Sequence, residues 1–385
     1  MNLAFYYHIP IIKKGDELYC PGFLGVFLDS IALEVNKLVL IMHESKHGTD
    51  SDYMLKQKNI SFISLGKKTS AWERMLFHKS ILKNKLVSID DCNLLLVRSP
   101  SPLAPYFKQY LKNTKLVYWV VGDYQEGAKL MKISSPRDLF IKAYLMIHNY
   151  IFLNQLKTVH TLVNSKFLFK KLKKICQKID LVKTTTLSKK DFFYRDDTCL
   201  NEKVNLLYTG RINWEKGLLE LIHAFSELKK SRNQLHLNIV GWENNPKKPV
   251  EKELRKITLE LNISDGVTFH GFKAIGDELN EMYQMADIYV LPSYHEGFPR
   301  TIWEAMANSL PVIATTVGSI PFDLIDGQDA ILINPKSILE IKMAISKIII
   351  NSDLRKRMIQ NGRNKAVENT LEIQNKRLIS TINHE

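Results

Sequence analysis

The segment from Asp287 to Ala314 constrains the fold of this chain more than any other stretch of its sequence. Asp287–Leu291 is a short apolar run with strand propensity, and Pro311–Ala314 resumes a buried strand. Between them, Pro299 suits the first turn of a helix, where its missing N–H is no loss, and the predicted helix is Arg300–Ala307. A strand, a tight loop, a helix and a second strand in this order predict a parallel sheet covered by helices.

Two glutamates mark this segment, Glu296 on the loop and Glu304 within the helix. The residue before Pro299 is Phe298, which offers no side-chain oxygen to cap the helix, so the first backbone N–H groups lack a local acceptor. A helix that begins at the carboxyl end of a parallel strand is a good anion site. We infer a phosphate here, with both glutamates binding hydroxyl groups beside it. The alternative is a surface turn with two solvated glutamates, which the glutamate pair alone would favour.

The whole string PSYHEGFPRTIWEAMANSLPVIAT carries more weight than the two glutamates. It resembles the E-x7-E signature of retaining, nucleotide-sugar-dependent glycosyltransferases of the GT-B type, family 4. The resemblance implies that Glu296 contacts the donor sugar, that Glu304 binds the ribose, and that backbone N–H groups between them hold the diphosphate. The candidate residues for that last role are Gly297, Phe298, Arg300 and Thr301.

A second basic turn lies upstream, where the predicted strand Lys203–Tyr208 runs into TGRINWEKGLLELIHAF. Arg211 and Lys216 bracket the loop, and Gly217 opens the next helix. A planar arginine fork and a lysine point charge suit a diphosphate. The string resembles the G-R-x4-K-G element of the same family, whose Arg and Lys hold the donor phosphates. A basic loop alone is usually only solvated, but together with the glutamate segment it favours the functional interpretation.

The N-terminal half resembles the family in its strand–helix alternation only. After a predicted first strand, Asn2–His8, we expect a long loop with Gly15, Gly22 and Gly25 before or within the start of a helix. Glycines ahead of a helix let the backbone approach a ligand, although a plain loop fits the sequence as well. The resemblance implies that this loop, Gly22 included, faces the donor diphosphate and the acceptor.

Many family members carry a histidine on the loop after the strand that corresponds to Lys115–Val121. This chain reads VYWVVGDYQEG there, and Asp123 is the nearest ionisable residue. Either Asp123 makes the polar contact to the donor sugar or that contact is absent. The D-x-D tripeptide Asp50-Ser51-Asp52 does not follow an apolar strand, so we interpret it as a polar loop and expect neither a metal nor a cofactor.

The 385 residues are enough for two domains, and the alternating strands and helices predict an α/β fold of the GT-B type. We expect two Rossmann-like, doubly wound parallel-sheet domains that face a cleft. Residues 1–185 would form the acceptor-binding domain and residues 203–370 the nucleotide-sugar-binding domain. The polar stretch 180–201 would connect them, and a last helix in 371–385 would pack back on the N-terminal domain.

Charge is divided unevenly between the two halves. Residues 1–190 hold 30 Lys+Arg against 14 Asp+Glu, a net charge of +16, whereas residues 191–385 carry −2. A strongly basic half suits an anionic partner: a membrane surface, a phosphorylated acceptor or nucleic acid. The alternative is a general lysine bias without functional meaning.

Two predicted basic helices are candidates for contact with a membrane. The first, Ser70–Val87, has an apolar face beside lysines, and its Trp72–Leu86 part is the expected site of shallow insertion. The second, Ser165–Lys178, is very basic and would contribute charge rather than inserted area. We expect reversible, peripheral binding through the N-terminal domain.

The location follows from what the sequence lacks. No apolar run reaches the roughly 18 residues of a spanning helix, and the N-terminus reads as a strand rather than a signal peptide. The four cysteines are scattered, which fits a reducing cytosol. We therefore expect a cytoplasmic protein at the inner face of the cell membrane.

These features together predict a glycosyltransferase. It would move a sugar from a nucleotide sugar to a saccharide acceptor, lipid-linked by expectation, in surface polysaccharide or lipopolysaccharide biosynthesis, with no nucleic-acid partner. By resemblance, transfer retains the anomeric configuration. Two alternatives stay open: a GT-B nucleotide-sugar epimerase, and a non-enzymatic module that binds anionic surfaces.

Overall fold

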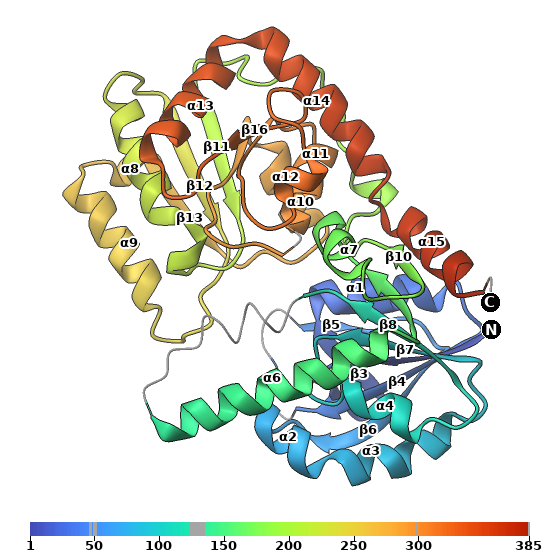
Figure 1. Ribbon diagram of the computed structural model, residues 1–385. Helices are drawn as coiled ribbons and strands as arrows, with labels where there is room; N and C mark the ends of the chain where they lie inside the picture. Colours follow the sequence, from blue (N-terminus) through green and yellow to red (C-terminus); the bar gives the residue numbers. More distant parts are fainter. Residues whose placement is uncertain (46–47, 49–51, 123–134, 298, 384–385) are drawn as a thin grey trace. The chain divides into compact units, whose positions relative to one another are not determined.

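The computed structural model describes residues 1–45, 48, 52–122, 135–297 and 299–383. The chain divides into two compact units, residues 1–184 with 374–385, and residues 185–373. Each unit is built on its own parallel sheet with helices on both faces (Figure 1). The two-sheet α/β fold class predicted from the sequence is confirmed.

Among its described residues, the main sheet of the first unit has seven parallel strands in the order β10–β9–β8–β7–β1–β4–β6. In chain order they are β1 (Asn2–Tyr6), β4 (Lys37–Glu44), β6 (Ile60–Lys67), β7 (Leu94–Ser99), β8 (Lys115–Val120), β9 (His160–Val163) and β10 (Ile179–Leu181). Both faces of this sheet are apolar because helices cover both, which is why its strands read as nearly continuous hydrophobic runs.

Two separate cores lie on the two faces of this sheet. One core holds side chains of α1 (Gly22–Ala32) together with Leu378 and Ile382 of the last helix, α15 (Leu371–Asn383). The other holds side chains of α3 (Lys79–Leu86), α4 (Ala104–Tyr110), α6 (Pro136–Leu156) and α7 (Lys166–Leu172). Asn375 of α15 also donates a hydrogen bond to Ser30 Oγ of α1 at 2.7 Å, so the end of the chain is an integral part of the first unit.

The segment after β1 corrects one expectation, because it is not a long loop. It folds into the hairpin β2 (Ile12–Lys14) and β3 (Glu17–Pro21), and β3 pairs with β5 (Asp52–Met54) to make a small antiparallel sheet. Gly15 has a φ of 61° at the hairpin turn, a conformation that glycine adopts without steric cost. Of the expected D-x-D loop, residues 50 and 51 lie outside the described part of the chain and Asp52 begins β5.

The helix predicted over Ser70–Val87 is two helices. The first, α2 (Ala71–Phe77), ends at His78, whose backbone has left the helical conformation, and α3 follows at once. Leu82 and Leu86 of α3 are 0% and 3% exposed and belong to the core, whereas Leu76 and Phe77 of α2 are 37% and 69% exposed. The insertion of Trp72–Leu86 into a membrane stays a prediction. The basic helix is also shorter than predicted, since α7 ends at Leu172.

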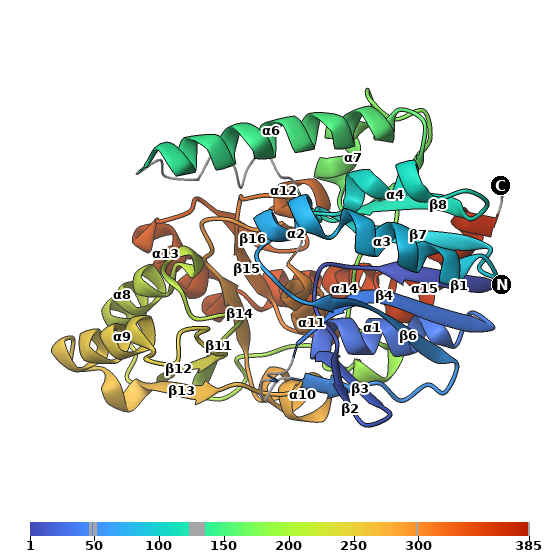
Figure 2. The same cartoon turned by 90° about the horizontal axis from the view of Figure 1, so that it is seen from below.

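In the part of the second unit that the structure describes, the sheet has six parallel strands in the order β13–β12–β11–β14–β15–β16. They are β11 (Val204–Thr209), β12 (Leu235–Val240), β13 (Val267–Gly271), β14 (Ile288–Leu291), β15 (Val312–Thr315) and β16 (Ile331–Ile333). Helix α8 (Leu218–Lys229) contacts both α9 (Pro249–Glu260) and α13 (Ile338–Ile350), and it lies between them (Figure 2). Helices α10 (Asp277–Gln284), α11 (Arg300–Ala307) and α14 (Ser352–Val367) form a second contacting group.

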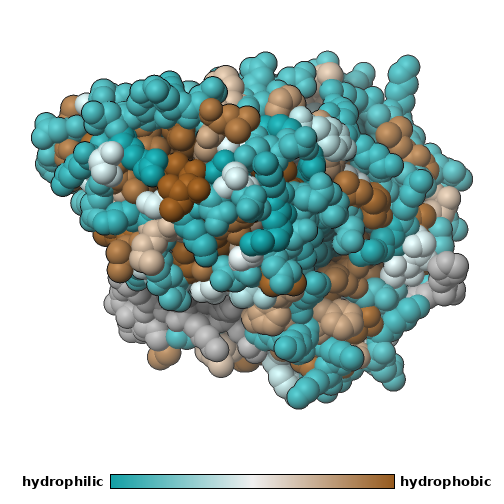
Figure 3. All heavy atoms as spheres, turned by 90° about the horizontal axis from the view of Figure 1, so that it is seen from above, coloured by the Kyte–Doolittle hydropathy of each residue, from teal (hydrophilic) through white to brown (hydrophobic). Residues whose placement is uncertain are grey.

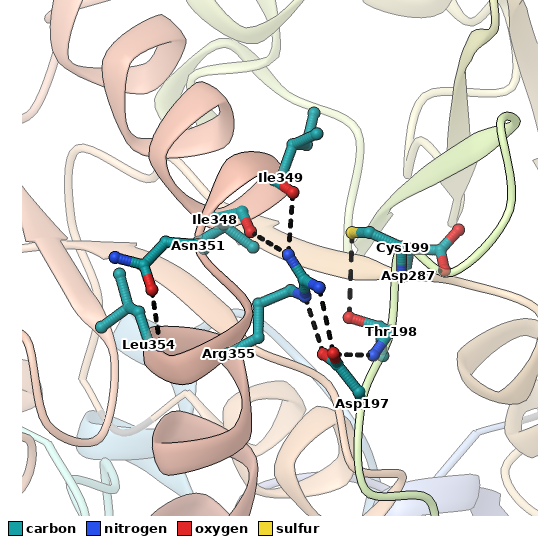
Figure 4. Close-up of polar contacts among 9 residues, drawn as sticks. All are labelled: Asp197, Thr198, Cys199, Asp287, Ile348, Ile349, Asn351, Leu354 and Arg355. Atoms are coloured by element: carbon teal, nitrogen blue, oxygen red, sulfur yellow. Dashed lines mark hydrogen bonds and ion pairs between the residues drawn. The ribbon is translucent and has the colours of Figure 1, made fainter.

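A buried ion pair ties the segment before β11 to the closing helices of this unit (Figure 4). Arg355 Nε and Nη2 of α14 lie 2.7 and 3.0 Å from the two carboxylate oxygens of Asp197. Arg355 Nη1 also donates to the backbone carbonyls of Ile348 and Ile349 at the end of α13. Burial alone would lower the pKa of Arg355, but the Asp197 carboxylate outweighs it and raises that pKa. Arg355 therefore connects α14 to the end of α13 and to the segment that contains Asp197.

The surface is polar over most of the face shown in Figure 3, where hydrophobic side chains form separate small patches. Within the described residues, no helix has both the length and the apolar composition to cross a bilayer.

Candidate functional site

The loops after β11 and β14 meet because these two strands are neighbours in the second sheet. Lys216 Nζ lies 2.6 Å from Glu296 Oε1, although the two residues are 80 positions apart in the chain. Their side chains are only 15% and 12% exposed, so the pair is largely shielded from water. The structure thus brings together the two sequence-predicted residues that belong to different motifs.

Close backbone approaches fix the shape of these loops. Gly217 has a φ of 67°, and a Cβ at this position would lie 2.0 Å from the carbonyl oxygen of Pro292 in the neighbouring loop. Gly318, with a φ of 57°, meets the carbonyl oxygen of Glu296 in the same way at 1.8 Å. Because only a residue without a side chain fits either place, the loops after β11, β14 and β15 pack backbone against backbone.

Helix α11 begins beside this pair without a side-chain cap. Its N-cap residue is Pro299, which makes no capping hydrogen bond, and its first turn contains no acidic residue. The bounds Arg300–Ala307 and the burial of Ile302 agree with the sequence prediction. The positive end of the helix dipole at this first turn therefore favours an anion beside it. Arg300 and Thr301 lie in that turn and are half-buried.

Glu304 is a buried residue, 8% exposed, with a partner on each carboxylate oxygen. Thr186 Oγ1 donates to Oε1 at 2.6 Å, and the Tyr283 hydroxyl donates to Oε2 at 2.9 Å. Burial, with the charge of Glu304 added, raises the pKa of Tyr283 well above its usual value, so the phenol keeps its proton and acts as the donor. Each Glu304 oxygen still has a lone pair that can accept a second hydrogen bond.

Arg211 is placed differently from Lys216. Its side chain is exposed, and its position is set by its backbone carbonyl, which accepts a hydrogen bond from the Tyr208 hydroxyl at 2.8 Å. Within the described part of the chain, Arg211 forms no ion pair, so its charge is available at the mouth of the same loop.

The remaining predicted residues lie apart from this group or outside the described structure. Gly22 is the first residue of α1 in the first unit, directly after Pro21, which does not cap the helix with its side chain. Gly297 is open on its Cα side, and its carbonyl accepts from Ser319 Oγ at 2.5 Å. Phe298 and Asp123 fall outside the described residues.

Three residues that position the glutamates were missed by the sequence reasoning: Thr186, Tyr283 and Ser319. They lie on three different segments, and their hydrogen bonds to Glu304 and Gly297 join residues 21 to 118 positions apart. No local pattern marks such partners, because a Ser, Thr or Tyr in a polar stretch has the same appearance whether or not it contacts a distant carboxylate. Among the described residues, no group of three or more His, Cys, Asp or Glu is arranged to hold a metal ion.

The comparison with known families is informative for this second unit. Residues 193–365 match the family model described as glycosyl transferases group 1. This segment, a little under half of the chain, is similar to that family. It contains Lys216, Glu296 and Glu304, the three residues whose geometry is described above.

Several relatives with curated names align over less than half of this chain. An MMP alpha-(1->4)-mannosyltransferase of Mycolicibacterium hassiacum is 32% identical over 156 residues, which is 40% of this chain and 36% of that protein. The chain thus spans little more than a third of the length of such relatives.

Solved structures resemble the whole chain at low identity. Anabaena Alr3699/HepE in complex with UDP has a TM-score of 0.73 at 17% identity, with 100% of both chains covered. WaaG, a glycosyltransferase involved in lipopolysaccharide biosynthesis, has a TM-score of 0.70 at 16% identity and covers 98% of each chain. These likenesses show the GT-B fold.

Proposed function

We propose that this protein is a glycosyltransferase that moves a sugar from a nucleotide-sugar donor to a saccharide acceptor. The observation that carries the proposal is the contact between Lys216 and Glu296 beside the uncapped start of α11, within the segment that is similar to glycosyl transferases group 1. A cation, a carboxylate and the backbone N–H groups at a helix start together can bind a diphosphate and orient the sugar attached to it.

The donor phosphates would lie between the loop after β11 and the first turn of α11. Lys216, Arg211 and the N–H groups of Arg300 and Thr301 stabilise the negative charge that develops on the leaving diphosphate. Before the donor arrives, the backbone of the loop that holds Lys216 is constrained at Gly217, and the Lys216 side chain is held by Glu296. That the solved Anabaena protein binds UDP, and was also solved with UDP-glucose, supports a nucleotide-sugar donor.

The two glutamates would have separate tasks. Glu296 orients the donor sugar, and in the free protein its carboxylate is held by Lys216. Glu304 binds the ribose through the lone pairs that Thr186 and Tyr283 leave open. We propose retention of the anomeric configuration and no metal cofactor, in keeping with the family that the E-x7-E string resembles.

The first unit would bind the acceptor. Gly22, at the start of α1, is proposed to lie close to the donor diphosphate, and Asp123 to supply the polar contact that a histidine makes in many family members. The proposed acceptor is a lipid-linked saccharide of a surface polysaccharide or lipopolysaccharide. The likeness to WaaG in fold supports this setting.

Helix α6 is the structural candidate for membrane contact. Its buried face includes Phe152 and Leu156, which are 3% and 0% exposed. Its outer face exposes between 46% and 67% of each of six large apolar side chains, spaced three, four and seven residues apart: Leu139, Phe140, Met146, Ile147, Tyr150 and Ile151. Such a stripe on a basic unit suits shallow insertion into an anionic bilayer from the cytoplasmic side.

The membrane proposal has a direct test. Liposome co-sedimentation would compare anionic with neutral lipid at low and high salt, for the wild type and for Ile147→Glu. The matched control is Leu259→Glu on α9, where the side chain is 64% exposed. We expect binding to anionic vesicles that falls with salt and with Ile147→Glu only. Equal recovery in the supernatant under all conditions would point to a soluble acceptor.

The transfer reaction itself is tested by incubating the protein with a panel of nucleotide sugars, with and without lipid-linked saccharide acceptors. We expect release of the nucleoside diphosphate that depends on the acceptor, with the product linkage read by NMR. Donor turnover without any acceptor would identify an epimerase instead. No turnover with any donor, together with no binding of any nucleotide, would contradict an enzymatic role.

A further inference from the structure

A second group of basic side chains lies in the first unit, at the carboxyl ends of neighbouring strands. Arg98 is on β7, His8 follows β1, His43 is on β4 and Lys68 follows β6, and these four strands are adjacent in the sheet. Arg74 of α2 reaches the same edge. We call these five residues the anion cluster.

Short contacts hold the cluster together. Arg74 Nη1 donates to the backbone carbonyl of His8 at 3.3 Å, and the Arg98 guanidinium lies 4.6 Å from the centre of the Tyr7 ring. On the other side, His43 Nε2 is 3.2 Å from Nδ1 of His78, the residue at which α2 gives way to α3. Parallel strands end at the same edge of a sheet, which is where ligands of such folds bind.

Arg98 is the residue that most needs an explanation. It is 8% exposed, it lies against the faces of Tyr7 and Trp119, and its Nε has no hydrogen-bond partner. Of the residues that the structure describes, none accepts a hydrogen bond from its guanidinium. Burial lowers the pKa of Arg98, yet arginine stays charged. A buried charge without a counter-charge is costly, so its retention indicates a ligand that supplies one.

The surroundings of Arg98 are positive rather than neutral. Across the described parts of the chain, no carboxylate forms an ion pair with His8, Lys68 or Arg98. Burial, then the charges of Arg74 and Lys68, lowers the pKa of His8 to about 4, and burial with Arg74 lowers the pKa of His43 to about 3. Both imidazoles are therefore uncharged at neutral pH, and the positive charges of Lys68 and Arg98 have no ion-pair partner among the described residues.

We propose that the anion cluster binds a phosphoryl group, and that this group belongs to the acceptor. The Arg98 guanidinium and the Lys68 ammonium together carry two positive charges, which match a phosphate monoester of about −1.5 to −2 at neutral pH better than a single carboxylate. The second clause rests on the proposed function, since it takes the first unit to be the acceptor unit. The phosphate site itself does not depend on transferase activity.

The test is isothermal titration calorimetry of the whole protein without nucleotide. The probes are inorganic phosphate, glucose 1-phosphate, short-chain phosphatidic acid below its micelle concentration, glucuronate and glucose. We expect saturable binding of the phosphates, weaker binding of glucuronate and none of glucose. Whichever of glucose 1-phosphate and the lipid phosphate binds more tightly shows whether the phosphoryl group of the acceptor is attached to a sugar or to a lipid. Equal or tighter binding of glucuronate, or no saturation with any phosphate, would overturn the proposal.

Three variants assign the site. Lys68→Ala removes an exposed cation and should weaken glucose 1-phosphate binding about tenfold. Lys67→Ala is the matched control, because it removes the same charge from the preceding residue, which is also exposed. Lys216→Ala changes the second unit only and should leave phosphate binding intact. Loss of phosphate binding in Lys216→Ala but not in Lys68→Ala would place the anion in the donor site and overturn the proposal.

Arg98→Met provides a readout that separates a ligand-binding role from a structural one. Methionine keeps an apolar side chain between Tyr7 and Trp119 but removes the uncompensated charge. If Arg98 serves a ligand, this variant loses phosphate binding while its melting temperature without ligand stays the same or rises. A fall in melting temperature with phosphate affinity unchanged would make Arg98 a structural residue. Transferase assays enter neither result, so failure of this proposal is distinguishable from failure of the proposed function.

Discussion

The contact between Lys216 and Glu296 allows an opposite prediction for its two partners. In the free protein the lysine ammonium donates to the carboxylate at 2.6 Å. A nucleoside diphosphate that binds Lys216 must compete with that carboxylate, although it does not itself carry the sugar that Glu296 is proposed to hold. Removing the carboxylate charge should therefore tighten binding of the nucleoside diphosphate, and removing the lysine should weaken it.

The magnitudes follow from the exposure of the pair. Exposed ion pairs contribute about 0.2–1 kcal/mol, and side chains that are 15% and 12% exposed belong near the upper end. Glu296→Gln should thus tighten binding by about 1 kcal/mol, roughly fivefold. Lys216→Ala removes a charged hydrogen bond to the phosphate, worth about 1.5–3 kcal/mol, and should weaken binding by roughly 10-fold to 150-fold.

Isothermal titration with UDP and with GDP would measure both effects, followed by the double variant. The double variant should behave like Lys216→Ala alone, because Glu296 acts on this ligand only through the lysine. Glu215→Gln is the matched control, since it removes a carboxylate charge from the exposed neighbour of Lys216. The reasoning fails if Glu296→Gln weakens diphosphate binding as much as Lys216→Ala does. Transfer of sugar should fall in both single variants.

Three further predictions concern stability and the ribose. Glu304→Ala should weaken nucleotide binding and lower the free energy of unfolding by about 2–4 kcal/mol, because it leaves the Thr186 and Tyr283 hydroxyls without their acceptor. Urea denaturation beside the titration would check it, and unchanged values in both would remove Glu304 from the site. Arg355→Met should cost about 3–5 kcal/mol because Asp197 is left as a buried, unpaired carboxylate, and adding Asp197→Leu should recover part of the loss. Equal urea midpoints for the wild type and Arg355→Met would show that the pair contributes nothing. For His43, the folded-state pKa of about 3 lies below the value of 6.5 for an unperturbed imidazole. The unfolded state therefore binds more protons in that window, so the free energy of unfolding should fall as the pH falls from 6.5 towards 3. Urea denaturation at several pH values should show that the free energy of unfolding of His43→Gln depends less on pH than that of the wild type.

The sequence alone determined the type and order of most elements. The helix Arg300–Ala307 was predicted with the bounds that the structure shows. The flanking strands Ile288–Leu291 and Val312–Thr315 differ from their predictions by a residue or so. Such calls succeed because a strand, a helix start and a turn depend on residues close together in the chain. The fold class follows from their alternation.

Local patterns were less reliable where an interaction from elsewhere decides the outcome. The segment after β1 forms the β2–β3 hairpin, and β3 pairs on its other edge with β5, which lies more than 30 residues further along the chain. The helix predicted across Ser70–Val87 is divided at His78, whose ring contacts the ring of His43 on strand β4. A sequence window contains neither partner.

The tertiary structure alone decided which residues share a site and which apolar faces meet water. Lys216 reaches Glu296 because the loops after two neighbouring strands meet, and Thr186, in the segment before β11, reaches Glu304 inside helix α11. Helix α6 is apolar on almost every side, so its periodicity gives no signal for the face that the sheet leaves exposed. Spacing along the chain fixes where a side chain points on its own element, but only the packing of elements fixes what that side chain meets.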